Sequence, residues 1–242
     1  MGSPDTILNP EELHPSLWRA SQLARSLTRC VDTGYLALSR QLPGGGWPTG
    51  TAIDLHVQQP GIGELRMLAP ALAAVAKRGI VLAEPPQVPQ GLGLAALGVD
   101  PCAALWLKTP RSADALWAAE QVLKSGACGA LLLWQNQIRT DSLRRLTLAA
   151  QTGETLFFMM RPLIAAQDPS PAALRLALRP QAGGIEIEFV KRRGPARDER
   201  LFLPMSVGVA LRIKPREHFY PEYQVPQSTV GRSGAAAMMT AG

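Results

Sequence analysis

The sequence predicts an α/β protein with a mostly parallel sheet that is flanked by helices and ends in a C-terminal antiparallel hairpin. Between residues 52 and 160, short apolar runs alternate with segments whose apolar residues recur at helical spacing. This is the order expected of parallel strands joined by helices. Between residues 174 and 189, apolar and charged residues alternate on both sides of a turn, which is typical of an antiparallel hairpin. The 242 residues, 46% of them hydrophobic, suffice for one full core.

The strands predicted for the parallel part are short and apolar. The run at 130–134 has no polar alternation, which is typical of a strand buried on both faces. Ser112 and Gly126 are the expected N-cap and C-terminal end of one helix, and Gly79 is the expected C-terminal end of another. The predicted strands are 52–57, 80–83, 104–107, 130–134 and 156–160, and the predicted helices are 65–78, 91–97, 112–124 and 140–151.

The last third of the core has the two-residue period of exposed strands. Leucines alternate with arginines over 174–179, and isoleucines alternate with glutamates over 185–189. We expect the apolar residues to face the core and the arginines to face outward opposite the glutamates, each pair contributing roughly 0.2–1 kcal/mol. A further edge strand is predicted at 200–204.

The predicted core spans residues 31–205 and has an extension at each end. Residues 1–30 are predicted to form a helical arm, because Leu17, Trp18, Leu23, Ala24 and Leu27 recur at helical spacing. Residues 206–242 are rich in Pro, Gly, Ser and Ala, and we expect this tail to be largely disordered on its own.

Composition excludes several classes of protein. The formal net charge of +6 permits contact with nucleic acid or with an acidic protein face. Three cysteines and three histidines are too scattered for a metal site. No apolar run reaches the roughly 18–20 residues that a membrane span needs, and the N-terminus lacks the pattern of a signal peptide, so a cytoplasmic protein is expected.

The five tryptophans are expected in two kinds of place. Trp106, Trp117 and Trp134 are expected in the core, while Trp18 and Trp47 are candidate interface residues.

Four segments, in order along the chain, resemble motifs of the RecA core. Residues 32–38 followed by 44–50 (DTGYLAL, GGGWPTG) resemble that family's approach to its nucleotide loop. Residues 97–101 (LGVDP) and 125–127 (SGA) resemble two further motifs, the second preceding a buried strand. The resemblance covers about residues 31–205 and implies a RecA-like core.

The residues that bind nucleotide in that family are missing at the matching positions. A phosphate-binding loop has the pattern G-x-x-x-x-G-K-[ST], in which the lysine reaches the outer phosphates. Here Gln58 replaces the first glycine, Gly63 is retained, Glu64 replaces the lysine and Leu65 replaces the hydroxyl residue. A carboxylate about 4 Å from a phosphate oxygen costs about 4 kcal/mol at an effective dielectric constant near 20. The loop is therefore a degenerate P-loop, and no nucleotide cofactor is expected.

Of the two acidic residues of the family's site, only one has a counterpart in this sequence. The strand that should end in a magnesium-binding aspartate ends in Trp134. Glu84 falls where the family places its catalytic glutamate, but without the lysine, the hydroxyl and the second acid we expect only local hydrogen bonds from it. The chain is therefore not expected to be an enzyme.

Among proteins with this core, the chain is similar to the ImuA family, RecA/SulA-related proteins of bacterial mutagenesis operons. The similarity rests on residues 17–20, 61–65, 97–101 and 185–194. It implies a non-catalytic, SOS-induced adaptor for translesion DNA synthesis that binds an ImuB-like Y-family protein. The RecA filament is a further candidate partner, an error-prone DnaE-type polymerase an indirect one, and direct contact with DNA stays open. The alternative is a SulA-type inhibitor of cell division that acts on FtsZ. The candidate partner-binding residues are Trp18, Leu23, Lys191, Arg192 and Arg193.

Overall fold

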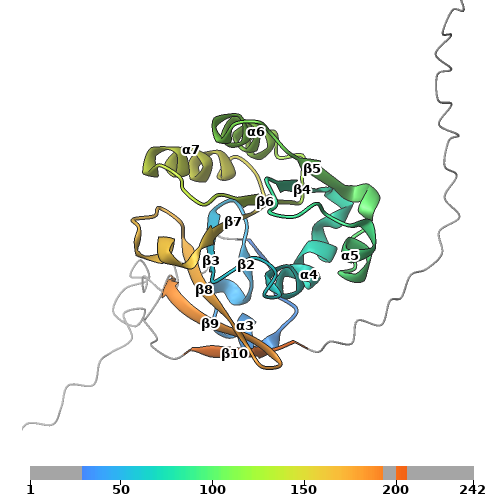
Figure 1. The fold of residues 1–242 in the computed structure, drawn as a ribbon, viewed down its shortest axis with the longest axis vertical. Helices are drawn as coiled ribbons and strands as arrows, with labels where there is room; N and C mark the ends of the chain where they lie inside the picture. Colours follow the sequence, from blue (N-terminus) through green and yellow to red (C-terminus); the bar gives the residue numbers. More distant parts are fainter. Residues whose placement is uncertain (1–28, 193–199, 206–242) are drawn as a thin grey trace, which may run out of the picture. The chain divides into compact units, whose positions relative to one another are not determined.

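A computed structural model describes residues 29–192 and 200–205 of the chain. Its main element is an eight-stranded mixed sheet in the order β10-β9-β8-β3-β7-β6-β4-β5 (Figure 1). Strands β8, β3, β7, β6, β4 and β5 run parallel, whereas β9 and β10 are antiparallel to their neighbours. The predicted α/β class, with its mostly parallel sheet and C-terminal hairpin, is confirmed.

The predicted strands of the parallel part match the structure closely. Four have the predicted bounds, and the fifth continues for two residues beyond Met160. They are β3 (Ala52–Val57), β4 (Ile80–Ala83), β5 (Ala104–Leu107), β6 (Ala130–Trp134) and β7 (Leu156–Pro162). A separate two-stranded sheet pairs β1 (Cys30–Val31) with β2 (Trp47–Pro48).

The predicted helices are present, with one error at a cap. Ser112 is the first residue of its helix and Arg111 is the N-cap, which makes no side-chain cap bond within the described residues. Gly126 and Gly79 end their helices with φ of 60° and 77°, values that glycine adopts without strain. The helices are α3 (Leu36–Ser39), α4 (Glu64–Val75), α5 (Gly91–Ala96), α6 (Ser112–Ser125) and α7 (Thr140–Ala150), with 3₁₀ turns η1 (Pro43–Gly45), η2 (Ala76–Arg78), η3 (Pro101–Ala103) and η4 (Leu163–Gln167).

Two apolar layers bury the two faces of the sheet. On one face, the odd-numbered residues of β3 pack with α3, α4 and Trp47. On the other face, Phe157 and Met159 of β7 pack with α6 and α7. Figure 1 shows these helices on opposite sides of the sheet. This arrangement leaves the carboxyl ends of β3, β4, β6 and β7 together at one edge.

The hairpin consists of β8 (Leu174–Gln181), β9 (Gly184–Lys191) and β10 (Leu201–Pro204). Its leucines and isoleucines are buried as predicted, and Arg179 pairs with Glu188 at 2.6 Å. The prediction of outward arginines is wrong for Arg175, which is buried. The reason is that η4 and the segment after it cover this part of β8, so that both of its faces are internal.

The positions of three tryptophans differ from the prediction. Trp47 is fully buried and meets the Phe158 ring edge-to-face with the centroids 5.4 Å apart, so it is not an interface residue. Trp106 and Trp117 are 46% and 62% exposed, because β5 is the edge strand of the sheet and Trp117 lies on the outer side of α6. Trp134 packs partly against the core.

A proline inside α4 is accommodated by a side chain from another element. Pro70 has no N–H, so the carbonyl of Arg66 lacks its helical donor. The Tyr35 hydroxyl donates to that carbonyl at 3.3 Å. Within the described residues no helix is long and apolar enough to cross a membrane.

Replacing Tyr35 by phenylalanine is expected to lower the free energy of unfolding by about 1 kcal/mol, because the Arg66 carbonyl loses this donor. In a Pro70→Ala background the N–H of residue 70 supplies the helical bond, so Tyr35→Phe should then cost less than half as much. Urea unfolding of the four proteins measures the difference. Equal costs in both backgrounds would contradict this account of Tyr35.

Candidate functional site

The carboxyl ends of the parallel strands surround a cavity of about 580 Å³, a size that suits a small ligand. Its lining includes Gln58 and Gln59 after β3, Glu84 after β4, Gln135 after β6 and Arg161 at the end of β7. In open α/β sheets this edge is the usual place for a ligand. A second, mostly apolar cavity of about 430 Å³ lies beside it, between the start of α4 and residues 85–97.

The loop between β3 and α4 holds its own carboxylate. Glu64, the first residue of α4, is 3% exposed. Its carboxylate accepts hydrogen bonds from the N–H of Gly61 at 2.8 and 3.1 Å and from the N–H of Gly63 at 3.2 Å. The two glycines have φ of 88° and 109°, which turns their N–H groups toward one point. Such a cluster of backbone N–H groups at a helix N-terminus is an anion-binding site, and here the anion is Glu64.

This contact extends the prediction made for the degenerate P-loop. The donors that would cradle a phosphate are already used, and Pro60 has no N–H to add. Gln58 is exposed, and its N–H donates to the Leu178 carbonyl at 3.2 Å. Leu65 packs against the core. The four residues singled out from the sequence therefore lie in the loop after β3 and at the start of α4, and they leave no open phosphate cradle.

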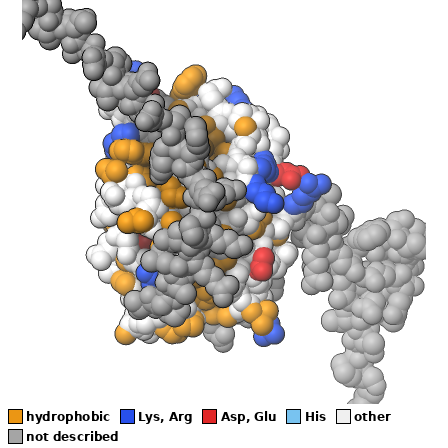
Figure 2. Space-filling view, turned by 90° about the vertical axis from the view of Figure 1, so that its right-hand side faces the viewer, with side chains coloured by type: hydrophobic (Ala, Val, Ile, Leu, Met, Phe, Trp, Pro, Cys, Tyr) orange, Lys and Arg blue, Asp and Glu red, His pale blue; other side chains and the backbone are white. Residues whose placement is uncertain are grey.

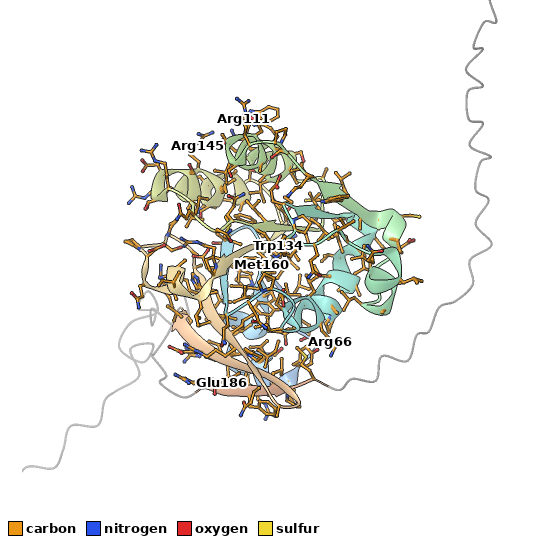
Figure 3. All side chains as sticks on the ribbon, in the orientation of Figure 1. Arg66, Arg111, Trp134, Arg145, Met160 and Glu186 are labelled. Atoms are coloured by element: carbon orange, nitrogen blue, oxygen red, sulfur yellow. The ribbon has the colours of Figure 1, made fainter. Side chains whose placement is uncertain are left out.

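Trp134 separates the two cavities and lines both. It is paired in register with Met160 of β7, and Figure 3 shows the two residues side by side at the middle of the molecule. The indole N–H of Trp134 is buried and has no acceptor among the described residues. A side chain of this size fills the strand end where the RecA resemblance would place a magnesium-binding acid.

Glu84 lines the first cavity, but its carboxylate is held by neighbouring residues. It has φ of 55° and is the one non-glycine residue with positive φ in the described part of the chain. Its carboxylate accepts from the Thr109 N–H at 2.6 Å and the Thr109 hydroxyl at 2.8 Å, and pairs with Lys108 at 3.1 Å. Burial alone would raise the pKa of Glu84, but the bonds from Thr109 and Lys108 outweigh burial and lower it. The expectation of local hydrogen bonds is confirmed.

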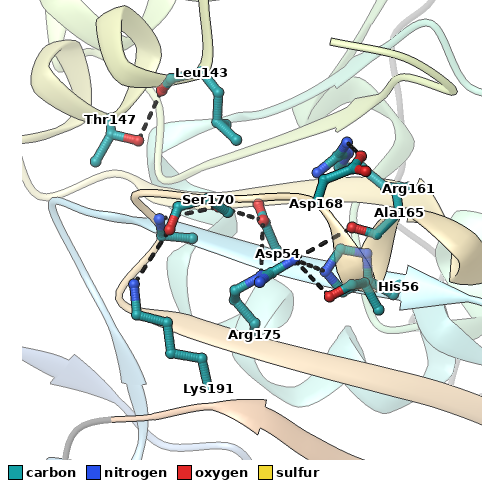
Figure 4. Close-up of polar contacts among 12 residues, drawn as sticks. Asp54, His56, Leu143, Thr147, Arg161, Ala165, Asp168, Ser170, Arg175 and Lys191 are labelled. Carbon is teal, nitrogen blue, oxygen red and sulfur yellow. Dashed lines mark hydrogen bonds and ion pairs between the residues drawn. The ribbon is translucent and has the colours of Figure 1, made fainter. Parts of the chain in front are cut away.

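A buried group of charged residues lies on the α6–α7 side of the sheet, and the sequence did not reveal it (Figure 4). Arg175 of β8 pairs with Asp54 of β3 at 3.6 Å, and its guanidinium donates to the carbonyls of Ala165 and Ala166 at 3.3 and 3.1 Å. The Ser170 hydroxyl donates to Asp54 at 2.6 Å. These contacts hold residues 165–170 against the sheet. The one signal in the sequence was an aspartate and a histidine inside an otherwise apolar strand.

Burial and charge shift the pKa values in this group. Burial raises the pKa of Asp54 despite the bond from Ser170 and the nearby arginines. Burial and then the positive charges of Arg175 and Arg161 lower the pKa of His56 to about 4. His56 is therefore neutral at pH 7, which suits a residue within 3.4 Å of the Arg175 guanidinium.

The candidate partner-binding residues are only partly described. Lys191 is exposed and donates to the Ser170 carbonyl at 3.2 Å. Arg192 lies over the Phe189 ring, 5.7 Å from its centroid, and donates to the Gln41 carbonyl at 2.5 Å. Both side chains thus also have structural contacts. Trp18, Leu23 and Arg193 lie outside the described residues, as do nearly all of the arm at 1–30 and the tail at 206–242.

Comparison of the chain with protein-family models and with curated proteins finds no match. In the part of the chain that the structure describes, no group of three or more His, Cys, Asp or Glu side chains is placed to hold a metal ion.

Acidification from pH 6.5 to 4 is expected to destabilise the protein through His56. The unfolded chain takes up a proton on His56 near pH 6.5, whereas the folded chain takes it up only near pH 4. The contribution of His56 to the free energy of unfolding therefore decreases as the pH is lowered over this range, by between about 1 and 3 kcal/mol. Asp54 acts in the opposite direction, because its pKa is raised on folding. His56→Gln should flatten the dependence, as measured by urea unfolding at several pH values. An unchanged pH profile in the variant would contradict this role.

Glu64→Ala is expected to lower the free energy of unfolding by about 1–2 kcal/mol, because the N–H groups of Gly61 and Gly63 lose their acceptor. Glu64→Gln keeps one carbonyl acceptor and should cost less. Gln59→Ala, an exposed change in the same loop, serves as the control and should be near neutral. Chemical denaturation measures all three, and equal values for Glu64→Ala and Gln59→Ala would refute the contact.

Proposed function

We propose that this chain is a non-catalytic, RecA-like adaptor in SOS-induced translesion DNA synthesis that binds an ImuB-like Y-family protein. The observation that carries the proposal is the Glu64 carboxylate, which occupies the N–H groups of Gly61 and Gly63. A nucleotide phosphate would have to displace a buried acid of the same charge. If a RecA-like protein does not bind nucleotide, its surface can still bind another protein, and this is the role that we propose.

Two further features support the absence of turnover. Leu65 and Trp134 stand where a hydroxyl and an acid would hold magnesium. Glu84, the remaining acid of the resemblance, is held by Thr109 and Lys108. At these positions, therefore, the described residues offer no group placed to hold a metal ion or an attacking water, which is what the proposal expects.

The described residues include a surface that suits a protein partner. Strand β5 is at the edge of the sheet, and its Leu105 and Trp106 are 59% and 46% exposed. An uncharged, apolar edge strand offers both side chains and unpaired backbone groups to another chain. Figure 2 views the side on which α5 and β5 lie in Figure 1 and shows hydrophobic side chains at the surface there. We include this edge in the proposed docking surface, beside the arm at 1–30 and the basic residues Lys191–Arg193.

The adaptor role predicts binding that depends on this edge. Trp106→Lys should weaken binding of the purified ImuB-like protein at least tenfold in an equilibrium titration, because a charge replaces the exposed indole. Ile164→Lys changes an exposed apolar residue of η4, which packs on β3, β7 and β8, whereas β5 lies beyond β6 and β4 at the edge of the sheet. This change should leave binding unchanged. Millimolar Mg·ATP should not shift the melting temperature of the wild-type chain.

Three outcomes would count against the adaptor. Saturable stabilisation by Mg·ATP, together with phosphate release, would show that the protein binds and hydrolyses nucleotide and is not a non-catalytic adaptor. Equal loss in Trp106→Lys and Ile164→Lys would remove β5 from the docking surface. Inhibition of FtsZ sedimentation at stoichiometric amounts, without binding of the ImuB-like protein, would favour the SulA-type role.

A further inference from the structure

Arg161 carries hydrogen-bond donors that nothing in the described part of the chain accepts. It lies at the end of β7, is 3% exposed, and donates from Nη2 to Asp168 at 2.7 Å (Figure 4). Its Nε and Nη1 are buried and have no acceptor among the described residues. An unmade hydrogen bond of a buried charged group costs about 1–3 kcal/mol or more. Such a group is a reason to look for a missing acceptor.

The charges around Arg161 do not balance. Three cations are close together on this side of the sheet: Arg161, Arg175 and, at its margin, Lys191. The carboxylates that face them are Asp54 and Asp168, and burial raises the pKa of Asp54. Among these residues Arg161, Arg175 and Asp54 are buried, whereas Asp168 and Lys191 reach solvent. The buried part of the group therefore carries an excess of positive charge, which favours an added anion.

Arg161 also lines the cavity at the carboxyl ends of the strands. The cavity is also lined by Gln135, Asn136 and Gln137, which have amide side chains, and by the apolar residues Val57, Trp134 and Met160. Amide N–H groups can donate to the same acceptor as a guanidinium. The apolar part of the wall suits the carbon skeleton of an organic ligand.

We propose that this cavity binds a small organic carboxylate, whose oxygens accept hydrogen bonds from Arg161. Asp168 indicates the chemistry, because its carboxylate already accepts one bond from this guanidinium while remaining 56% exposed. A ligand carboxylate competes with Asp168 and gives the unpaired donors an acceptor. Phosphate gains less here, because the converging N–H groups of the loop are held by Glu64 and phosphate has no carbon skeleton to place against the apolar part of the wall. The proposal does not depend on the docking role.

Titration of the full chain with sodium glutarate tests the site, with sodium chloride at matched ionic strength as the blank and sodium phosphate as the competing anion. Calorimetry should show saturable glutarate binding that is at least tenfold weaker in Arg161→Gln. Asp168→Asn should bind at least threefold tighter, because the guanidinium loses its internal partner. Arg200→Gln, which removes an exposed arginine of the hairpin, should leave binding unchanged.

The two variants are expected to change the affinity for glutarate in opposite directions, which a general loss of structure would not do. If Arg161→Gln fails to fold, Arg161→Lys and the exposed-site variant Asp168→Asn decide the matter. Absence of saturable glutarate binding, unchanged or weaker binding in Asp168→Asn, or tighter binding of phosphate than of glutarate overturns the proposal. Circular dichroism of each variant confirms that the fold is retained.

Discussion

The contact between the Glu64 carboxylate and the N–H groups of Gly61 and Gly63 determines the shape of the candidate site. The loop adopts a conformation that needs two glycines at positive φ, and such a conformation is stable only when its converging N–H groups have an acceptor. With Glu64 as that acceptor, the loop and the start of α4 are fixed without a ligand. The same contact places Pro60 and Gly63 in the wall of the second cavity.

The strands were predictable from the sequence because each is a short apolar run between clear turn signals, and their bounds depend only on local pattern. The order of the strands is a property of the whole fold, and it decides which residues are exposed. Trp106 was therefore expected in the core, although β5 is the edge strand. Trp47 was expected at the surface for the converse reason: it follows three glycines in the sequence, but it packs against Phe158.

Gln58, Gly63, Glu64 and Leu65 could be singled out from the sequence, because they lie in one short stretch that can be compared with a motif of fixed spacing. The buried charges were not found, because Asp54, Arg161 and Arg175 come from three strands that only the sheet brings together. Arg175 in particular follows a leucine–arginine alternation that is typical of a strand with one exposed face. Its burial results from the cover that residues 163–172 place on β8.

Two carboxylates of the chain, Glu64 and Asp168, accept hydrogen bonds at the carboxyl edge of the sheet. They differ in whether the donors around them are left without an acceptor. Glu64 is buried and occupies the N–H groups that converge on it, so an external anion gains little by replacing it. Asp168 is half exposed and occupies one nitrogen of Arg161, while two buried nitrogens stay without an acceptor. Exchange of a carboxylate at Arg161 adds bonds that the folded chain does not make by itself, whereas exchange at Gly61 and Gly63 only replaces existing ones. This difference explains why the loop between β3 and α4 is closed to an external anion, whereas the neighbouring cavity, as proposed, accepts one.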